Sequence, residues 1–501
     1  MRRSITQVAK VFSIFVLSMI IGCEQGRYGG AASQAASGPD YLQISKNYAD
    51  TLIEHGRDKY GTQHSPLFIS ALDCNSLSML EIEGKPKRMS GIRNGDRMLK
   101  GANPMHDQDM YQLLYALSEL TGDKRYAKEA DKALKWFFDN CQSPTTGLMT
   151  WGEHIGWGFE TETITYARGD NHEFFGSWVL WDRCFKLAPK ACENFARGLW
   201  EHQIHDHETG DFSRHASWKE HRTGPHNGYP RHGGFYIATW GNAYEHTKDP
   251  LFLKAIETLV DHYNNNSSPY TGAIPCSTNP GRITIMWPES NLSLAVDLWE
   301  TARKVPDRLA EKMRKRALKT DVIYLRLEHD FSPDGKGFVA GANVHTLERL
   351  TEGPWTDTDI WATAYGKSTD AQVAMLCYLR YKQVGNEGFH RLVVDSAARY
   401  LDTSPNMDIT LFPGSLGNAI FLMLASHELS GDKRYLDRAD YFARQALEVF
   451  FDEGCPLPKA SSEDNQYETI TGSDDLMASM VKLWAAKNRP GAAVPIEYNN
   501  R

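Results

Sequence analysis

The feature that most constrains the fold is a helical hairpin that recurs along the chain. Residues 110–140 form an apolar segment, a short turn and an amphipathic segment, and residues 419–453 repeat the pattern almost element for element. Both turns read Gly-Asp-Lys-Arg-Tyr, at residues 122–126 and 431–435. Apolar residues recur at i, i+3, i+4 and i+7 in each arm, a period that indicates helix rather than strand.

The turns and two looser copies extend the repeat. In the first turn Gly122 is expected to end one helix and Asp123 to cap the next. Looser copies of the hairpin occupy residues 236–263 and 371–401. A repeated hairpin needs neighbours to cover its apolar face, so such pairs stack into a superhelix or close into a ring.

The connections between the hairpins favour the ring. Residues 151–170 and 213–234 are polar and rich in aromatic side chains, which is too elaborate for a plain protein-binding solenoid. We therefore predict an all-α fold, an (α/α) toroid of about six to seven hairpins with an active site at one mouth. No linker divides the body, so residues 41–501 are predicted to form one catalytic domain. A protein-binding solenoid is the alternative.

The first residues have the features of an export signal. A basic start precedes an apolar run that ends at Gly22-Cys23 and is shorter than the roughly 20 residues of a membrane span. The junction resembles the lipobox of bacterial lipoproteins, which implies a signal peptide over residues 1–22 and a lipid on Cys23. Residues 23–40 are predicted to be a flexible tether. We expect a lipoprotein of the cell envelope, on the outer-membrane or periplasmic side, whose body is soluble.

Composition excludes several classes of protein. The net charge is -8, and a nucleic-acid-binding protein would carry a basic face instead. The seven cysteines other than Cys23 have no CxxC spacing, which argues against zinc ribbons and thioredoxin motifs. No nucleic-acid partner is therefore expected, and the lipid on Cys23 is expected to hold the protein at a membrane.

Histidines are concentrated in one segment. Nine of the 18 histidines fall between Trp151 and His232, among arginines and carboxylates. These groups are costly to bury, so their concentration favours chemistry over packing. We predict that this segment carries the functional site. The alternative is a solvated, histidine-rich surface loop.

Three residues of this segment are candidate metal ligands: His154, Glu173 and His215. Glu173 is expected to open an apolar helix over residues 174–185. Two neutral imidazoles and a carboxylate leave coordination positions open and suit a transition metal better than calcium. The predicted cofactor is a divalent transition metal (Mn, Ni or Co), with Ca as the alternative. Taken singly, each histidine could equally make a structural hydrogen bond.

Arginines and aromatic residues near these ligands indicate an anionic sugar. Cations outnumber carboxylates between Arg214 and His232, which suggests a ligand that takes bidentate guanidinium contacts. Tryptophans in polar company are suited to stacking on sugar faces. The residues expected to contact the substrate are Arg168, Trp218, Arg231, His232 and Trp287.

These features together suggest an enzyme that cleaves an acidic polysaccharide. For a uronate, the difficult step is removal of the weakly acidic proton at C5, and a metal on the C6 carboxylate would stabilise the negative charge that develops. A base takes the proton and the glycosidic oxygen leaves from C4. This β-elimination needs no pair of catalytic carboxylates, whereas glycoside hydrolysis does.

The chain resembles the family 2 polysaccharide lyases in the segment 56–68, in the ligand trio and in the Arg214-His215 pair. Those proteins are pectate lyases with an (α/α)7 barrel, a transition metal held by two histidines and a glutamate, and an arginine base. The resemblance implies that His154, Glu173 and His215 bind the metal and that Arg214 is the base. Arg231-His232 is the alternative pair.

Two rival functions remain open. One is a glycoside hydrolase of the (α/α) type, such as an unsaturated-uronyl hydrolase, and the other is a lipoprotein that binds glycans without cleaving them. A lyase creates an unsaturated end that absorbs ultraviolet light, which neither rival does. The candidate acids for hydrolysis are Glu160, Glu162, Asp170 and Asp359.

Overall fold

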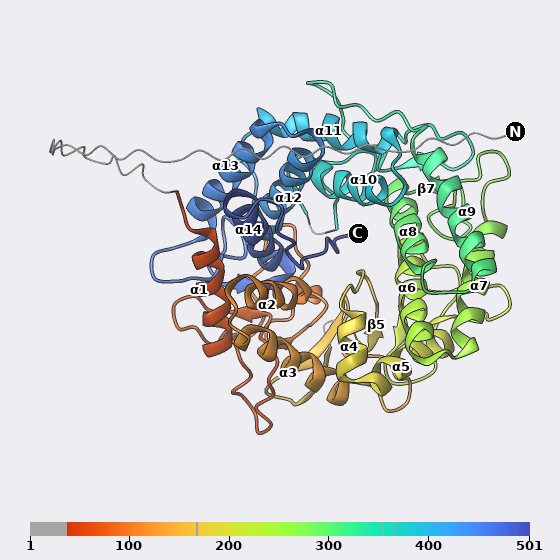
Figure 1. Cartoon of the computed structure of the whole chain (residues 1–501). Coiled ribbons are helices and arrows are strands. Elements are labelled where there is room, and N and C mark those ends of the chain that lie inside the picture. The colour runs from red at the N-terminus through yellow and green to blue at the C-terminus, as the bar shows by residue number, and fades with distance from the viewer. Residues whose placement is uncertain (1–37, 167–168, 354, 365) are drawn as a thin grey trace, which may run out of the picture. The chain divides into compact units, whose positions relative to one another are not determined.

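Helical hairpins follow one another around a ring in the computed structural model (Figure 1). The structure describes residues 38–166, 169–353, 355–364 and 366–501. Within them, Asp40–Arg501 form one compact unit. The predicted signal peptide, most of the tether, the lipid site at Cys23 and the substrate contact at Arg168 lie outside the described residues.

The described residues contain fourteen α-helices, which alternate between the inside and the outside of the ring (Figure 1). The inner helices are α2 (Gln108–Thr121), α4 (Trp181–Leu187), α6 (Pro230–Thr247), α8 (Pro288–Thr301), α10 (Asp370–Val384), α12 (Pro413–Ser430) and α14 (Ser473–Asn488). The outer helices are α1 (Tyr41–Glu54), α3 (Arg125–Asn140), α5 (Pro189–Gly198), α7 (Pro250–Asn265), α9 (Asp307–Tyr324), α11 (Glu387–Leu401) and α13 (Lys433–Phe450). This confirms the predicted (α/α) toroid.

The two closest copies of the repeat show how the sequence makes a hairpin. Gly122 and Gly431 end α2 and α12 in the left-handed conformation, with φ of 79° and 69°. Asp123 and Asp432 then accept a hydrogen bond from the backbone N–H two residues on, at 2.9 Å in both. The predicted stop at Gly122 is confirmed, but the predicted cap is one residue too early, because Lys124 is the N-cap of α3 and Asp123 precedes it. Helices α3 and α13 turn one apolar face inward, whereas α12 is buried along nearly its whole length.

The ring closes between the two ends of the described unit. Helix α14 packs against α1, α2 and α12. Strand β1 (Ala71–Leu72) pairs with β9 (Tyr467–Glu468) in antiparallel register. Close by, the buried hydroxyls of Tyr48 and Tyr467 lie 2.8 Å apart. First and last hairpins are thus joined by packing, by backbone pairing and by a side-chain hydrogen bond.

Short strands and helical turns occupy the connections. The remaining strands are β2 (Gly101–Ala102), β3 (Ile155–Gly158), β4 (Thr163–Tyr166), β5 (Asn171–His172), β6 (Ala216–Ser217), β7 (Ile285–Met286) and β8 (Ala342–Asn343). They form sheets in the orders β2-β3-β4, β5-β6 and β7-β8. The turns of 3-10 or π type are η1 (Asn94–Asp96), η2 (Leu199–Gln203) and η3 (Thr469–Thr471).

The helix predicted over residues 174–185 is wrong over residues 174–180, and only residues 181–185 are helical. Glu173 follows strand β5, and α4 begins only at Trp181. The amide side chain of Gln108 donates to the carbonyl of Ser177 and accepts from the N–H of Val179, at 2.8 and 2.7 Å. These backbone groups are therefore satisfied without a helix, and the intervening aromatic residues fill the core.

A cavity of about 250 Å³ opens where inner helices begin. Asp109 of α2, Arg231 of α6 and Asp475 of α14 are among the side chains that line it. The C-terminal residues 499–501 also line it, and the C-terminus lies inside the ring (Figure 1). In the part of the chain that the structure describes, no helix is both long and apolar enough to cross a membrane.

Candidate active site

Strand pairing places Glu173 opposite His215. In the antiparallel pair of β5 with β6, Asn171 faces Ser217 and His172 faces Ala216. One further step in this register puts Glu173 across from His215. Residues that face one another across an antiparallel pair have β-carbons about 4.5–5.5 Å apart, so their side chains meet. A two-residue ladder thus joins positions 42 residues apart in the sequence.

A tight turn brings His154 to the same place. Gly152 has a φ of +120°, and a β-carbon on it would lie 2.2 Å from the backbone oxygen of Glu173. Only glycine permits this approach. Asn103 holds the turn by donating to the carbonyl of Gly152 at 2.7 Å. His154 follows directly before β3, where it reaches the carboxylate of Glu173.

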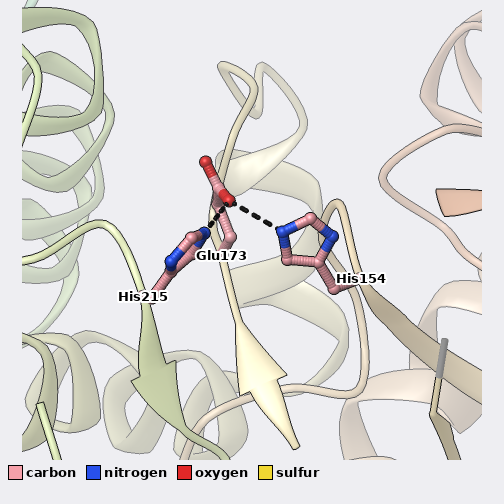
Figure 2. A group of neighbouring side chains, drawn as sticks. All are labelled: His154, Glu173 and His215. Atoms are coloured by element: carbon pink, nitrogen blue, oxygen red, sulfur yellow. Dashed lines mark hydrogen bonds and ion pairs between the residues drawn. The ribbon is translucent and has the colours of Figure 1, made fainter. Parts of the chain in front are cut away.

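The carboxylate of Glu173 is the centre of the cluster. Figure 2 shows it between two imidazoles: Oε2 lies 3.3 Å from Nε2 of His154 and 2.7 Å from Nε2 of His215. Its other oxygen accepts a hydrogen bond from Nε of Arg214 at 2.8 Å and lies 3.1 Å from Nε2 of His232. Four basic groups therefore surround one buried carboxylate.

His154, Glu173 and His215 fit a divalent transition metal. One donor atom from each lies within 4.8 Å of the others. An ion at about 2.0–2.2 Å from every donor needs donors within about 4.4 Å of one another, which small side-chain shifts would provide. The His215 side chain is 29% exposed, so a coordination position could face substrate. Asp96 Oδ1 lies 3.1 Å from Nδ1 of His154, an outer carboxylate contact that is typical of metal-binding histidines.

The charges at the cluster depend strongly on one another. Burial alone would raise the pKa of Glu173, but hydrogen bonds from His154, His215 and His232 hold it well below its usual range. Burial likewise lowers the pKa of His154, but hydrogen bonds to Asp96 and Glu173 outweigh it and raise that pKa to about 9. Positively charged neighbours thus balance the negative charge of Glu173. A bound metal cation would supply this positive charge in their place.

Arg214 is held from three sides. Besides Nε on Glu173, its Nη1 donates to Oδ1 of Asn227 at 2.9 Å and to the hydroxyl of Tyr229 at 3.1 Å. Its guanidinium carbon lies 4.7 Å from the centre of the Tyr229 ring. Among the described residues, Nη2 has no hydrogen-bond partner. The side chain is 20% exposed, so this nitrogen is the one suited to meet a substrate.

The two residues of the alternative pair, Arg231 and His232, lie in different places in the structure. The side chain of His232 is fully buried beneath Glu173, and burial lowers its pKa to about 4. A buried neutral imidazole cannot touch a polymer, so the prediction that His232 contacts substrate is wrong, and the residue positions Glu173 instead. Arg231 lines the central cavity, and its backbone N–H donates to the hydroxyl of Ser290 at 3.0 Å.

The two predicted tryptophans lie in different settings. Trp218 is half-buried against the core, and its backbone pairs with Asp170. Trp287 packs edge-on against Tyr229 with ring centres 4.8 Å apart. Since Tyr229 contacts Arg214, Trp287 lies one residue away from the candidate base.

Several residues of the site were not foreseen. Glu153 lies 3.4 Å from His154 and also lines the central cavity. It therefore lies between the candidate metal ligands and the cavity. Burial, with the charge of Glu173, raises the pKa of Glu153 to about 7. Arg93 pairs with both Glu153 and Asp96. Glu153 could have been suspected from its position next to His154, whereas Asp96 carries no signal in the sequence.

The acids of the hydrolase alternative make separate contacts. In the described residues no hydrogen bond joins any two of them. The pairs are Glu160 with Lys100, Glu162 with Thr62, Asp170 with Arg222, and Asp359 with Lys367. In the cavity, burial and a hydrogen bond to Asp475 raise the pKa of Asp109 well above its usual range.

Comparison with known proteins places this cluster in a matched segment. Residues 84–269 match the model of a family described as periplasmic pectate lyase. The match covers less than half of the chain, but it includes the three candidate ligands, Arg214 and Asp96.

Solved structures with a similar arrangement have low sequence identity. A cellobiose 2-epimerase from Bacillus thermoamylovorans is 11% identical over 88% of this chain and 99% of its own, with a TM-score of 0.48. A family 76 α-mannanase from Bacteroides thetaiotaomicron is 10% identical over 90% and 96%, with a TM-score of 0.45. An unsaturated glucuronyl hydrolase specific for heparin is 12% identical over 90% and 99%, with a TM-score of 0.46.

Proposed function

We propose that the protein is a polysaccharide lyase that cleaves a uronate-containing, pectate-like polysaccharide by metal-assisted β-elimination. The observation that carries the proposal is the shared carboxylate of Glu173. One of its oxygens meets His154 and His215, and the other holds Arg214. The side chain of Glu173 thus contacts both the candidate metal ligands and the candidate base. All of these residues lie within the segment similar to periplasmic pectate lyases.

His154, Glu173 and His215 would hold the metal, which when bound supplies positive charge to the C6 carboxylate of the sugar. Asp96 and His232 fix the ligands from behind. Asn227, Tyr229 and Glu173 hold the guanidinium of Arg214 and leave Nη2 without a hydrogen-bond partner among the described residues. The neutral form of Arg214 accepts the proton from C5, the released electron pair forms the C4–C5 double bond, and the glycosidic oxygen leaves C4 and takes up a proton.

Arg214→Lys tests the proposal. Lysine keeps the charge but loses the planar fork that three neighbours hold, so we expect turnover on polygalacturonate to fall by at least about 100-fold while polymer binding persists. The assay follows the ultraviolet absorbance of the unsaturated product. Arg231→Lys serves as the matched variant, and we expect it to retain more turnover than Arg214→Lys. The reverse order would make Arg231 the base.

The outcome with the wild type separates the rival functions. A hydrolase would shorten the polymer without producing the absorbance, and a glycan-binding protein would bind it without shortening it. Either result on every polyuronate tested would overturn the proposal.

We also propose that the protein is a lipoprotein of the cell envelope with lipid on Cys23. The Gly22-Cys23 junction after a basic and apolar start supports this. Cys23→Ala should move the protein from the membrane fraction to a soluble or unprocessed form in a host with lipoprotein processing. A wild type without lipid in such a host would contradict it.

A further inference from the structure

The hydroxyl of Tyr229 accepts hydrogen bonds from two arginines. Nη1 of Arg214 donates to it at 3.1 Å and Nη1 of Arg282 at 2.7 Å. Arg282 comes from the connection between α7 and α8, outside the segment that matches the family model. Tyr229 is 8% exposed and Arg282 is exposed, so the second guanidinium lies at the surface beside the first.

Among the described residues, no carboxylate pairs with the guanidinium of Arg282. Arg214 has the carboxylate of Glu173, but no carboxylate of a described residue lies within 4.0 Å of the Arg282 guanidinium. Its only side-chain hydrogen bond among the described residues goes to the neutral phenol of Tyr229. Two guanidinium groups that share one neutral acceptor repel one another, and an anion between or beside them would relieve this.

An aromatic ring completes the setting. The guanidinium carbon of Arg282 lies 5.9 Å from the centre of the Trp287 ring. Trp287 is partly exposed at the N-terminal end of α8. An aromatic ring offers apolar area to the face of a sugar, and a guanidinium offers a fork to its carboxylate.

We propose that Arg282 and Trp287 form a binding site for a carboxylate-bearing sugar unit beside Arg214, with the carboxylate on Arg282 and the sugar face on Trp287. The choice of a uronate as ligand rests on the proposed function, but the site is defined by binding and not by cleavage. Its consequence is that Arg282 selects acidic over esterified sugar units.

The test compares a galacturonate trimer with its methyl ester, which lacks the negative charges. Dissociation constants are measured by calorimetry on chelator-treated protein, so that turnover does not interfere. Arg282→Gln should weaken binding of the acid trimer by about tenfold or more, as expected for a charged hydrogen bond, and leave binding of the ester unchanged. Arg391→Gln, at an exposed position on α11, is the matched control and should change neither. Trp287→Ala should weaken binding of both trimers alike.

Three results would overturn the proposal. Unchanged affinity of Arg282→Gln for the acid trimer would remove the carboxylate contact, and an equal loss for acid and ester would assign Arg282 to hydroxyl groups instead. Trp287→Ala with both affinities intact would remove the stacking contact. Failure of the proposed function is a separate result, because absence of cleavage by the wild type would leave an Arg282-dependent preference for the acid trimer measurable.

Discussion

The hairpin of α12 and α13 and the segment between α3 and α6 are built in opposite ways. The hairpin has two helices of 18 residues joined by a tight turn. The other segment has helices of seven and ten residues, with short strands and long polar connections between them. Apolar contacts hold the first. The second also contributes aromatic residues to the core, but its polar side chains are arranged by hydrogen bonds and by close glycine turns such as that at Gly152. We infer that stability depends mainly on the hairpins and activity on the polar segment.

The largest effect is expected from His215→Ala. It removes a candidate metal ligand that is only partly buried, so activity and bound metal should both fall by more than about 100-fold, beyond the effect of losing an outer partner. The thermal midpoint should change little. Metal content, turnover and thermal melting check this. If the variant keeps the metal content of the wild type, His215 is not a ligand.

Phe442→Ala tests the other side of the comparison. Phe442 is fully buried in α13 and packs against Trp361 and Tyr400. Removing it should lower the free energy of unfolding by about 3–5 kcal/mol, as measured by denaturant titration. Turnover at low temperature should stay near that of the wild type. Loss of activity in a folded variant would show that the hairpin and the site are not independent.

Asp96→Asn should lower the metal affinity of the candidate site and leave the rest of the protein unchanged. The substitution keeps the size of the buried side chain but removes the carboxylate that orients His154. We expect metal affinity to fall by about 10–100-fold, as for other outer partners of metal-binding histidines. A metal titration of the wild type and of Asp96→Asn measures this affinity. Identical affinities would show that Asp96 does not orient His154 for metal binding.

The smallest expected effect is a change in how the stability of the protein depends on acidic pH. It involves His329, which lies between α9 and α10. Burial lowers the pKa of His329 to about 4, and its Nδ1 accepts the N–H of Val339 at 3.1 Å. An unfolded histidine titrates near about 6.5, so the unfolded chain binds more protons between these values. Stability from the neutral imidazole is therefore complete above about pH 6.5 and is lost as the pH falls towards 4. His329→Asn should flatten this part of the curve of thermal midpoint against pH. A curve as steep as that of the wild type would assign the acid sensitivity elsewhere.

The sequence predicts the hairpins better than the polar connections, for a physical reason. Helical periodicity and the Gly-Asp turn are local, and α2, α3, α12 and α13 follow from them. The candidate ligands could be chosen by residue type, but not the contacts that position them. His154 meets Asp96 across 58 residues, and Gln108 prevents a helix after Glu173 by binding backbone groups about 70 residues away. Such contacts depend on the folded ring and leave no periodic pattern.

The most direct test of the account is the ultraviolet absorbance produced when the wild type acts on polygalacturonate, recorded before chelation, after chelation and after a divalent transition metal is restored. The account predicts that the absorbance rises, that chelation abolishes the rise, and that Mn, Ni or Co restores it. Shortening of the polymer without a rise in absorbance would contradict β-elimination. A rise that continues after the metal has been removed would contradict a metal at His154, Glu173 and His215.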